Sequence, residues 1–246
     1  SFLSKAMHGR AFPRSQNFSY GQAPALRRIG LGLSHRISHR WKTDGKPCSK
    51  RMTPKKKESL FHPDPGEGNA RAGYVGKIVT DDLGAYPNRH VSVESDKELV
   101  VGPIRYAFRS FDRQWLPPDS RLLSRPRPEL WSQLSDRQVF LTAPEDLSPS
   151  AGPPVTYTGL LPDMHHYHGR GGRVYPLWRD RTACEPNIKP ALLSDLAKVY
   201  GQPVKAEDVM AYIAAVMAHP TFTARFKTDL VRPGLHVPVT ADAGLF

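Results

Sequence analysis

Proline is the feature that most constrains the fold of this chain, because it occupies 24 of the 246 positions. Proline lacks a backbone N–H and clashes with the preceding helical turn, so it interrupts helix interiors and central strands alike. Long helices are therefore not expected before residue 190, and the middle of the chain should consist of short strands joined by ordered loops. Residues rich in β-branched and aromatic side chains give the candidate strands 74–79, 98–106, 138–142, 155–160 and 173–177.

The pattern changes to that of helices near the C-terminus. Pro190 and Gly201 are a start and a stop signal, and they predict a helix over 190–200. After Pro203, apolar residues recur from Val209 to Met217 at the spacing of one helix face, which predicts a second helix. Pro220 opens a third helix that should run to about residue 230. The sequence thus predicts an α+β fold with a mixed sheet of short strands, ordered loops and a helical C-terminal subdomain.

The net charge of +12 is confined to the first quarter of the chain. Residues 1–60 carry 14 basic and two acidic side chains, and residues 61–246 carry 21 of each. Residues 1–60 show neither helical nor strand periodicity and are expected to form a largely disordered basic segment, or alternatively a basic arm that lies on DNA phosphates. Residues 61–97 are expected to form a linker and the first strands. A positive surface on the neutral remainder would require its arginines to cluster in space.

Two cysteines, Cys48 and Cys184, lie far apart in the sequence. They form neither a disulfide framework nor a cysteine-rich zinc motif, which fits a reducing, cytoplasmic setting. No apolar run reaches about 18 residues, so membrane insertion is not expected.

Arginines alternate with aromatic residues from Tyr106 to Trp131. Arg105, Arg109 and Arg113 recur at intervals of four. Planar guanidinium groups suit phosphates and guanine edges, and aromatic rings support them by stacking. The alternative is an arginine–carboxylate lattice with Asp112 and Asp119, in which the aromatic residues form a core.

Further arginines follow in RLLSRPRPELW, where prolines restrain the backbone. Arg121, Arg125 and Arg127 are candidates for phosphate contacts, because a restrained segment loses less entropy when it docks on a ligand. An ordinary surface loop is the alternative.

A histidine-rich segment, DMHHYHGRGGR, begins at Asp163. Its carboxylate and the side chains of His165, His166 and His168 are of types that bind metals, but helical histidine spacing and a distant fourth ligand are missing. We therefore favour a polar loop, followed by a flexible glycine-rich turn, over a metal site.

Residues 98–246 resemble the C-terminal specificity region of type ISP restriction-modification enzymes, large single-chain proteins that recognise, methylate and cut DNA. The order of blocks carries the resemblance: YAFRSFDRQWLPPDSRLLSRPRPELW, SDRQVFLTA, the Asp-His-Gly loop, GGRVYPLWRD and AEDVMAYIAAVMAHPTFTARF. It implies that residues 98–246 form a target recognition domain. This domain would bind double-stranded DNA and steer a linked adenine methyltransferase and an ATP-driven nuclease.

The resemblance and the clustering of side chains together give the predicted DNA-binding residues. They are Arg105, Arg109, Arg113, Arg125, Arg127, His165, His166, Arg170 and Arg173.

No methyltransferase, Walker or nuclease motif occurs in the chain. We therefore expect no catalytic residue and no bound metal or cofactor here; S-adenosylmethionine, ATP and Mg²⁺ would belong to the family's other modules. A fragment or truncated homologue that binds DNA is the expected identity. Two alternatives stay open: a docking module for a methyltransferase partner, and a metal-dependent nuclease built on Asp163, His165 and His168.

Overall fold

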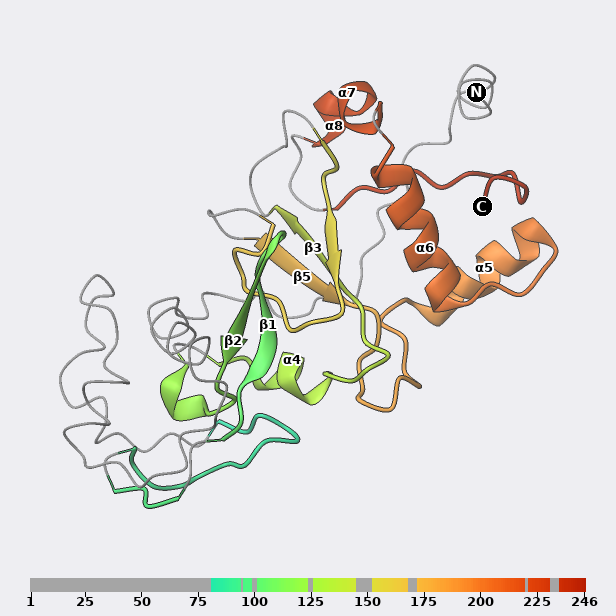
Figure 1. The fold of residues 1–246 in the computed structure, drawn as a ribbon. Coiled ribbons are helices and arrows are strands. Elements are labelled where there is room, and N and C mark those ends of the chain that lie inside the picture. Colours follow the sequence, from blue (N-terminus) through green and yellow to red (C-terminus); the bar gives the residue numbers. More distant parts are fainter. Residues whose placement is uncertain are drawn as a thin grey trace.

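The computed structural model describes residues 81–93, 95–98, 101–123, 126–144, 152–167, 172–219, 221–230 and 235–246 (Figure 1). The expectations for the basic segment 1–60 and for a strand at 74–79 lie outside these ranges. No helix within them is both long and apolar enough to cross a membrane.

Strands β1 (Ile104–Arg109) and β2 (Asp112–Leu116) form an antiparallel hairpin. The hairpin is amphipathic because side chains alternate between the two faces of a strand. Tyr106 and its cross-strand partner Gln114 are buried on one face, whereas Arg105 and its partner Trp115 lie on the other. The sequence predicts a strand over 98–106. The structure begins it at Ile104, directly after Pro103, which cannot donate a backbone hydrogen bond.

A three-stranded antiparallel sheet lies beside the hairpin, with the strand order β4-β3-β5. It comprises β3 (Phe140–Pro144), β4 (Thr156–Thr158) and β5 (Gly172–Pro176), close to three of the predicted strands. Gly172 is required where β5 meets β3, because a Cβ there would lie 2.7 Å from the carbonyl oxygen of Ala143.

Helices α5 (Pro190–Tyr200) and α6 (Ala206–Met217) agree with the predicted pair, and Gly201 ends α5 in the left-handed conformation with φ of 66°. The predicted third helix is two short ones, α7 (Phe222–Arg225) and α8 (Lys227–Leu230). The helix is interrupted because Phe226, with φ of −102° and ψ of 21°, leaves the helical conformation between them.

The three-stranded sheet separates two apolar cores. Leu141 and Ala143 pack with residues of α5, α6 and α7 on one face, and Phe140 and Val174 pack with Tyr106 and with Trp131 of α4 (Pro128–Ser132) on the other. Figure 1 shows α5 to α8 gathered on one side of β3 and β5, and the hairpin with α4 on the other. This arrangement confirms the predicted α+β class. On the outer face of the hairpin, Arg105 and Arg113 are exposed, Trp115 is half-buried and Ala107 is buried.

Candidate nucleic-acid interface

The outer face of the β1–β2 hairpin carries predicted DNA-binding residues on a regular scaffold. Arg105 lies opposite Trp115, and its guanidinium carbon is 4.5 Å from the centre of the indole ring. Arg113, opposite Ala107, is exposed on the same face. A guanidinium held on an aromatic ring keeps its N–H groups available to an external acceptor. This face can therefore present two arginines and an indole to an anionic ligand.

The hairpin turn places Phe111 in solvent. Its relative exposure of 102 % means that its side chain contacts essentially no other part of the protein. Phe111 is one of the aromatic residues between Tyr106 and Trp131, for which the sequence predicts stacking on arginines or a place in a core. The turn is not predicted, because Ser110 and Phe111 lack the glycine or asparagine that usually marks a tight hairpin.

Residues 161–167 lie along the edge of β1 that does not pair with β2, and they anchor the hairpin. The backbone N–H of Ala107 donates to the carbonyl oxygen of Leu161 over 3.0 Å, and that of Asp163 donates to the carbonyl of Ala107 over 2.9 Å. At the turn, the hydroxyl of Ser110 donates to the carbonyl of His166 over 3.0 Å. The arginine–aromatic segment and the histidine-rich segment, separate in the sequence, are thus neighbours in space.

The carboxylate of Asp163 joins these two segments. It accepts hydrogen bonds from the Tyr106 hydroxyl at 2.5 Å, from Nη1 of Arg109 at 3.1 Å and from the backbone N–H of His165 at 2.7 Å. Burial raises the pKa of the Asp163 carboxyl, and these donors limit the rise. Arg109 also lies 3.9 Å from the centre of the Phe108 ring, so its partly exposed guanidinium is both stacked and partly neutralised.

His166 lies inside the protein rather than on the DNA-facing surface that the sequence suggested. Its side chain is 2 % exposed, and its Nδ1 is 2.9 Å from the Thr142 hydroxyl and 3.2 Å from that of Thr156. Burial, and then the charge of Arg109, lower the pKa of His166 to about 4. It is therefore a neutral interior group at pH 7 that holds the 163–167 turn against β3 and β4.

Within the parts of the chain that the structure describes, no group of three histidine, cysteine or acidic side chains could hold a metal ion. Both oxygens of Asp163 already accept hydrogen bonds. His165 is half-buried beside it, and His168 lies outside the described residues. Because His168 is one of its three residues, the alternative of a nuclease built on Asp163, His165 and His168 stays a prediction.

Two of the other predicted residues, Arg127 and Arg173, are described by the structure and lie on separate elements. Arg127 precedes α4 and is half-buried. Arg173 lies on β5 opposite Ala143, on the sheet face that packs against the helices. Arg125 and Arg170 lie outside the described residues.

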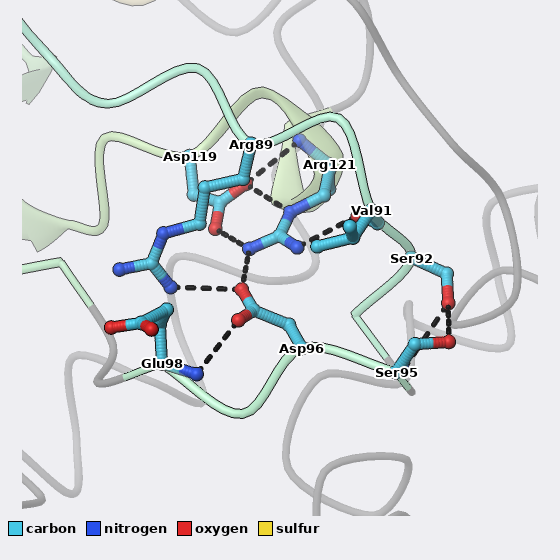
Figure 2. Close-up of polar contacts among 8 residues, drawn as sticks. All are labelled: Arg89, Val91, Ser92, Ser95, Asp96, Glu98, Asp119 and Arg121. Carbon is cyan, nitrogen blue, oxygen red and sulfur yellow. Dashed lines mark hydrogen bonds and ion pairs between the residues drawn. The ribbon is translucent and has the colours of Figure 1, made fainter.

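Arg121, a candidate for phosphate contact, is instead the centre of a buried ion-pair network (Figure 2). It is 5 % exposed, and its Nη2 lies 2.6 Å from Asp119 Oδ2 and 2.8 Å from Asp96 Oδ2. Its Nη1 donates to the carbonyl of Val91 over 2.9 Å, and Arg89 also pairs with Asp96. Because its guanidinium is enclosed by protein acceptors, Arg121 is not a phosphate ligand. It connects Val91 and Asp96 to the turn at Asp119, and this agrees in part with the alternative of an arginine–carboxylate lattice.

Comparison with known proteins confirms the resemblance. A family model, the type ISP C-terminal specificity domain, matches residues 80–246. Among solved structures, one titled "cryoEM structure DrdV-DNA complex" is similar to this chain, with 16 % sequence identity and a TM-score of 0.49. The similarity covers 89 % of this chain and 22 % of that one, so the chain spans about a fifth of its length. No curated protein matches the sequence. With more than half of its length covered by the family model, the chain belongs to the type ISP C-terminal specificity domain family.

Proposed function

We propose that residues 80–246 bind double-stranded DNA in a sequence-specific manner, as the target recognition domain of a type ISP restriction-modification system. Membership of a specificity-domain family is the observation that carries this proposal. The outer face of the β1–β2 hairpin supports it, because Arg105 and Arg113 offer guanidinium donors beside the indole of Trp115. A two-stranded ribbon has the width that the major groove admits, and an arginine there pairs with guanine O6 and N7.

The same proposal assigns methyl transfer and cleavage to other modules of the system, in the same chain or in partner chains. S-adenosylmethionine, ATP and Mg²⁺ would be bound by those modules. This domain would contribute the choice of site, through base contacts from the hairpin and phosphate contacts from arginines around it.

The test begins with selection of bound duplexes from a random pool by the whole chain. A shared sequence should emerge, and binding to it should weaken with salt with a log–log slope of about −0.9 for each phosphate neutralised. The alternative, a protein-docking module, would be favoured by two results together: no sequence is enriched from the pool, and the affinity of the chain for duplex DNA does not change with salt concentration.

Replacing Arg105 and Arg113 together with alanine should weaken binding to the selected duplex. We expect a loss of about 1 to 3 kcal/mol for each arginine that pairs with a base, or a salt slope smaller in magnitude by about 0.9 for each that contacts a phosphate. Affinity measured by fluorescence anisotropy over a range of salt concentrations separates the two.

The matched control is the double variant Lys189→Ala and Lys198→Ala, which removes the same charge from exposed positions at α5, on the far side of the sheet. If the two double variants lose affinity for the duplex equally, only the net charge of the chain matters, and the hairpin is not the contact surface.

A further inference from the structure

We propose that Phe111 at the tip of the β1–β2 hairpin enters a groove of the bound duplex and stacks on a base at a partly unstacked base step. The inference rests on the proposed function and deepens it, since it names the residue that makes an apolar contact inside the recognised site.

The ring of Phe111 is exposed to an unusual degree for an apolar side chain. Phe111 is fully exposed, whereas every other large apolar side chain that the structure describes is at most 61 % exposed. Turn positions ordinarily hold small or polar residues, because an apolar ring there gains nothing from the protein's own core. A phenyl group at this position therefore contributes its burial energy only when a partner covers it.

Hydrogen bonds hold the turn that carries Phe111. Ser110, adjacent to Phe111, donates its hydroxyl to the carbonyls of His166 at 3.0 Å and Tyr167 at 3.4 Å. Below the turn, Arg109 and Tyr106 both bond to the buried carboxylate of Asp163. An exposed side chain on an anchored turn loses little backbone entropy when it inserts into a ligand, so the tip is preorganised.

The strands on either side of Phe111 carry mostly basic charged side chains. Strands β1 and β2 carry three arginines and one acid, Asp112, whose Oδ2 already accepts a hydrogen bond from Gln114 over 2.8 Å. Arg105 and Arg113 share the outer face of the hairpin. Cationic groups flanking a protruding phenyl ring suit a partner that is a polyanion outside and a stack of rings inside, which describes duplex DNA. Phenylalanine is one of the apolar side chains that proteins bound in the minor groove insert between base steps. Here the same kind of contact is proposed for a ring at the tip of a hairpin.

The test uses the whole chain and the duplex obtained by selection, with 2-aminopurine placed in turn at each position of the site. Binding of the wild-type chain should change the fluorescence of 2-aminopurine at one base step, where the stack is opened. Phe111→Ala should abolish that change and weaken binding about 5- to 150-fold, the range that corresponds to loss of one base–aromatic contact.

Two further variants keep the test specific. Phe111→Trp retains an aromatic ring and should retain both the fluorescence change and most of the affinity. Val199→Ala shortens another exposed apolar side chain, 61 % exposed on α5, and should change neither.

The outcomes separate this inference from the proposed function. If the wild-type chain binds no duplex, the proposed function fails and the inference fails with it. If the wild-type chain binds tightly and Phe111→Ala binds equally well, the domain still recognises DNA but the inserted ring is refuted. Persistence of the fluorescence change in Phe111→Ala would refute it too.

Discussion

Arg121→Met is expected to lower the free energy of unfolding by about 3 to 5 kcal/mol, the cost of breaking a buried ion pair from one side. Asp119 and Asp96 would remain within the protein, with side chains 8 % and 5 % exposed, after losing the guanidinium between them. Methionine replaces the aliphatic stem of arginine and lacks only the guanidinium end, so the effect reports the lost charge and hydrogen bonds more than lost volume. Urea unfolding of the whole chain, followed by circular dichroism, measures it.

Arg137→Met is the control, because Arg137 pairs with Glu207 at 3.9 Å with both side chains largely exposed. Such a pair contributes about 0 to 1 kcal/mol. Adding Asp119→Asn to Arg121→Met should recover part of the loss, since the uncompensated charge of Asp119 disappears, whereas Asp96 keeps its pair with Arg89. If Arg121→Met lowers the free energy of unfolding no more than Arg137→Met does, the network does not hold Asp96 against the turn at Asp119.

The change in the free energy of unfolding at acidic pH also tests this network. Burial by itself raises the pKa of the Asp96 carboxyl, but hydrogen bonds from the backbone of Glu98 and from Arg121 and Arg89 outweigh it, so the pKa lies below its usual value. A carboxyl with a depressed pKa stabilises the fold above its ordinary pKa and loses that contribution as the pH falls further. The difference in free energy of unfolding between wild type and Arg121→Met should therefore become smaller below about pH 4.

The second large effect is expected from His166 on acidification. Its pKa is about 4 in the folded protein and about 6.5 when the chain is unfolded, so the unfolded state binds the proton more tightly. Stability should be intact above pH 6.5 and should decline as the pH falls toward 4, by up to about 3 kcal/mol from this residue. Asp163, whose pKa is raised, contributes with the opposite sign, so the comparison with a variant is what isolates His166.

His166→Asn places an amide near the position of Nδ1 and removes the titration. Urea unfolding at several pH values between 7 and 4 should show that the free energy of unfolding falls less steeply for this variant than for wild type. His219→Asn, at a histidine that hydrogen-bonds to Thr221 in an exposed setting, should keep the wild-type decline. Parallel profiles for wild type and His166→Asn would contradict an interior, neutral imidazole.

Much of the fold could be predicted from local signals in the sequence. Helix α5 begins at Pro190 and ends before Gly201 as predicted, because both signals act within one helical turn. The hairpin was not predicted, although the alternation of buried and exposed residues along its two strands was in the sequence, because its turn carries a phenylalanine. The third helix was predicted as one element because periodicity does not reveal the break at Phe226.

The candidate site was only partly accessible. The sequence indicated that arginines and aromatic residues between Arg105 and Trp115 belong together, and the register of the hairpin places Arg105, Arg113 and Trp115 on one face. It did not separate these arginines from Arg121, which has the same chemistry and a similar local setting. Exposure distinguishes them, and exposure depends on which acidic side chains lie nearby in space.

The sequence by itself determined the α+β class, the C-terminal helices, the neutral balance of charge after residue 60 and the family, because composition, capping residues and block order are properties of the linear chain. Only the tertiary structure decided which groups are interior and which face solvent. The bond between Tyr106 and Asp163 joins residues 57 positions apart, and that between Arg121 and Asp96 joins residues 25 apart. Burial and pairing of this kind arise from packing between distant segments, so no local pattern specifies them.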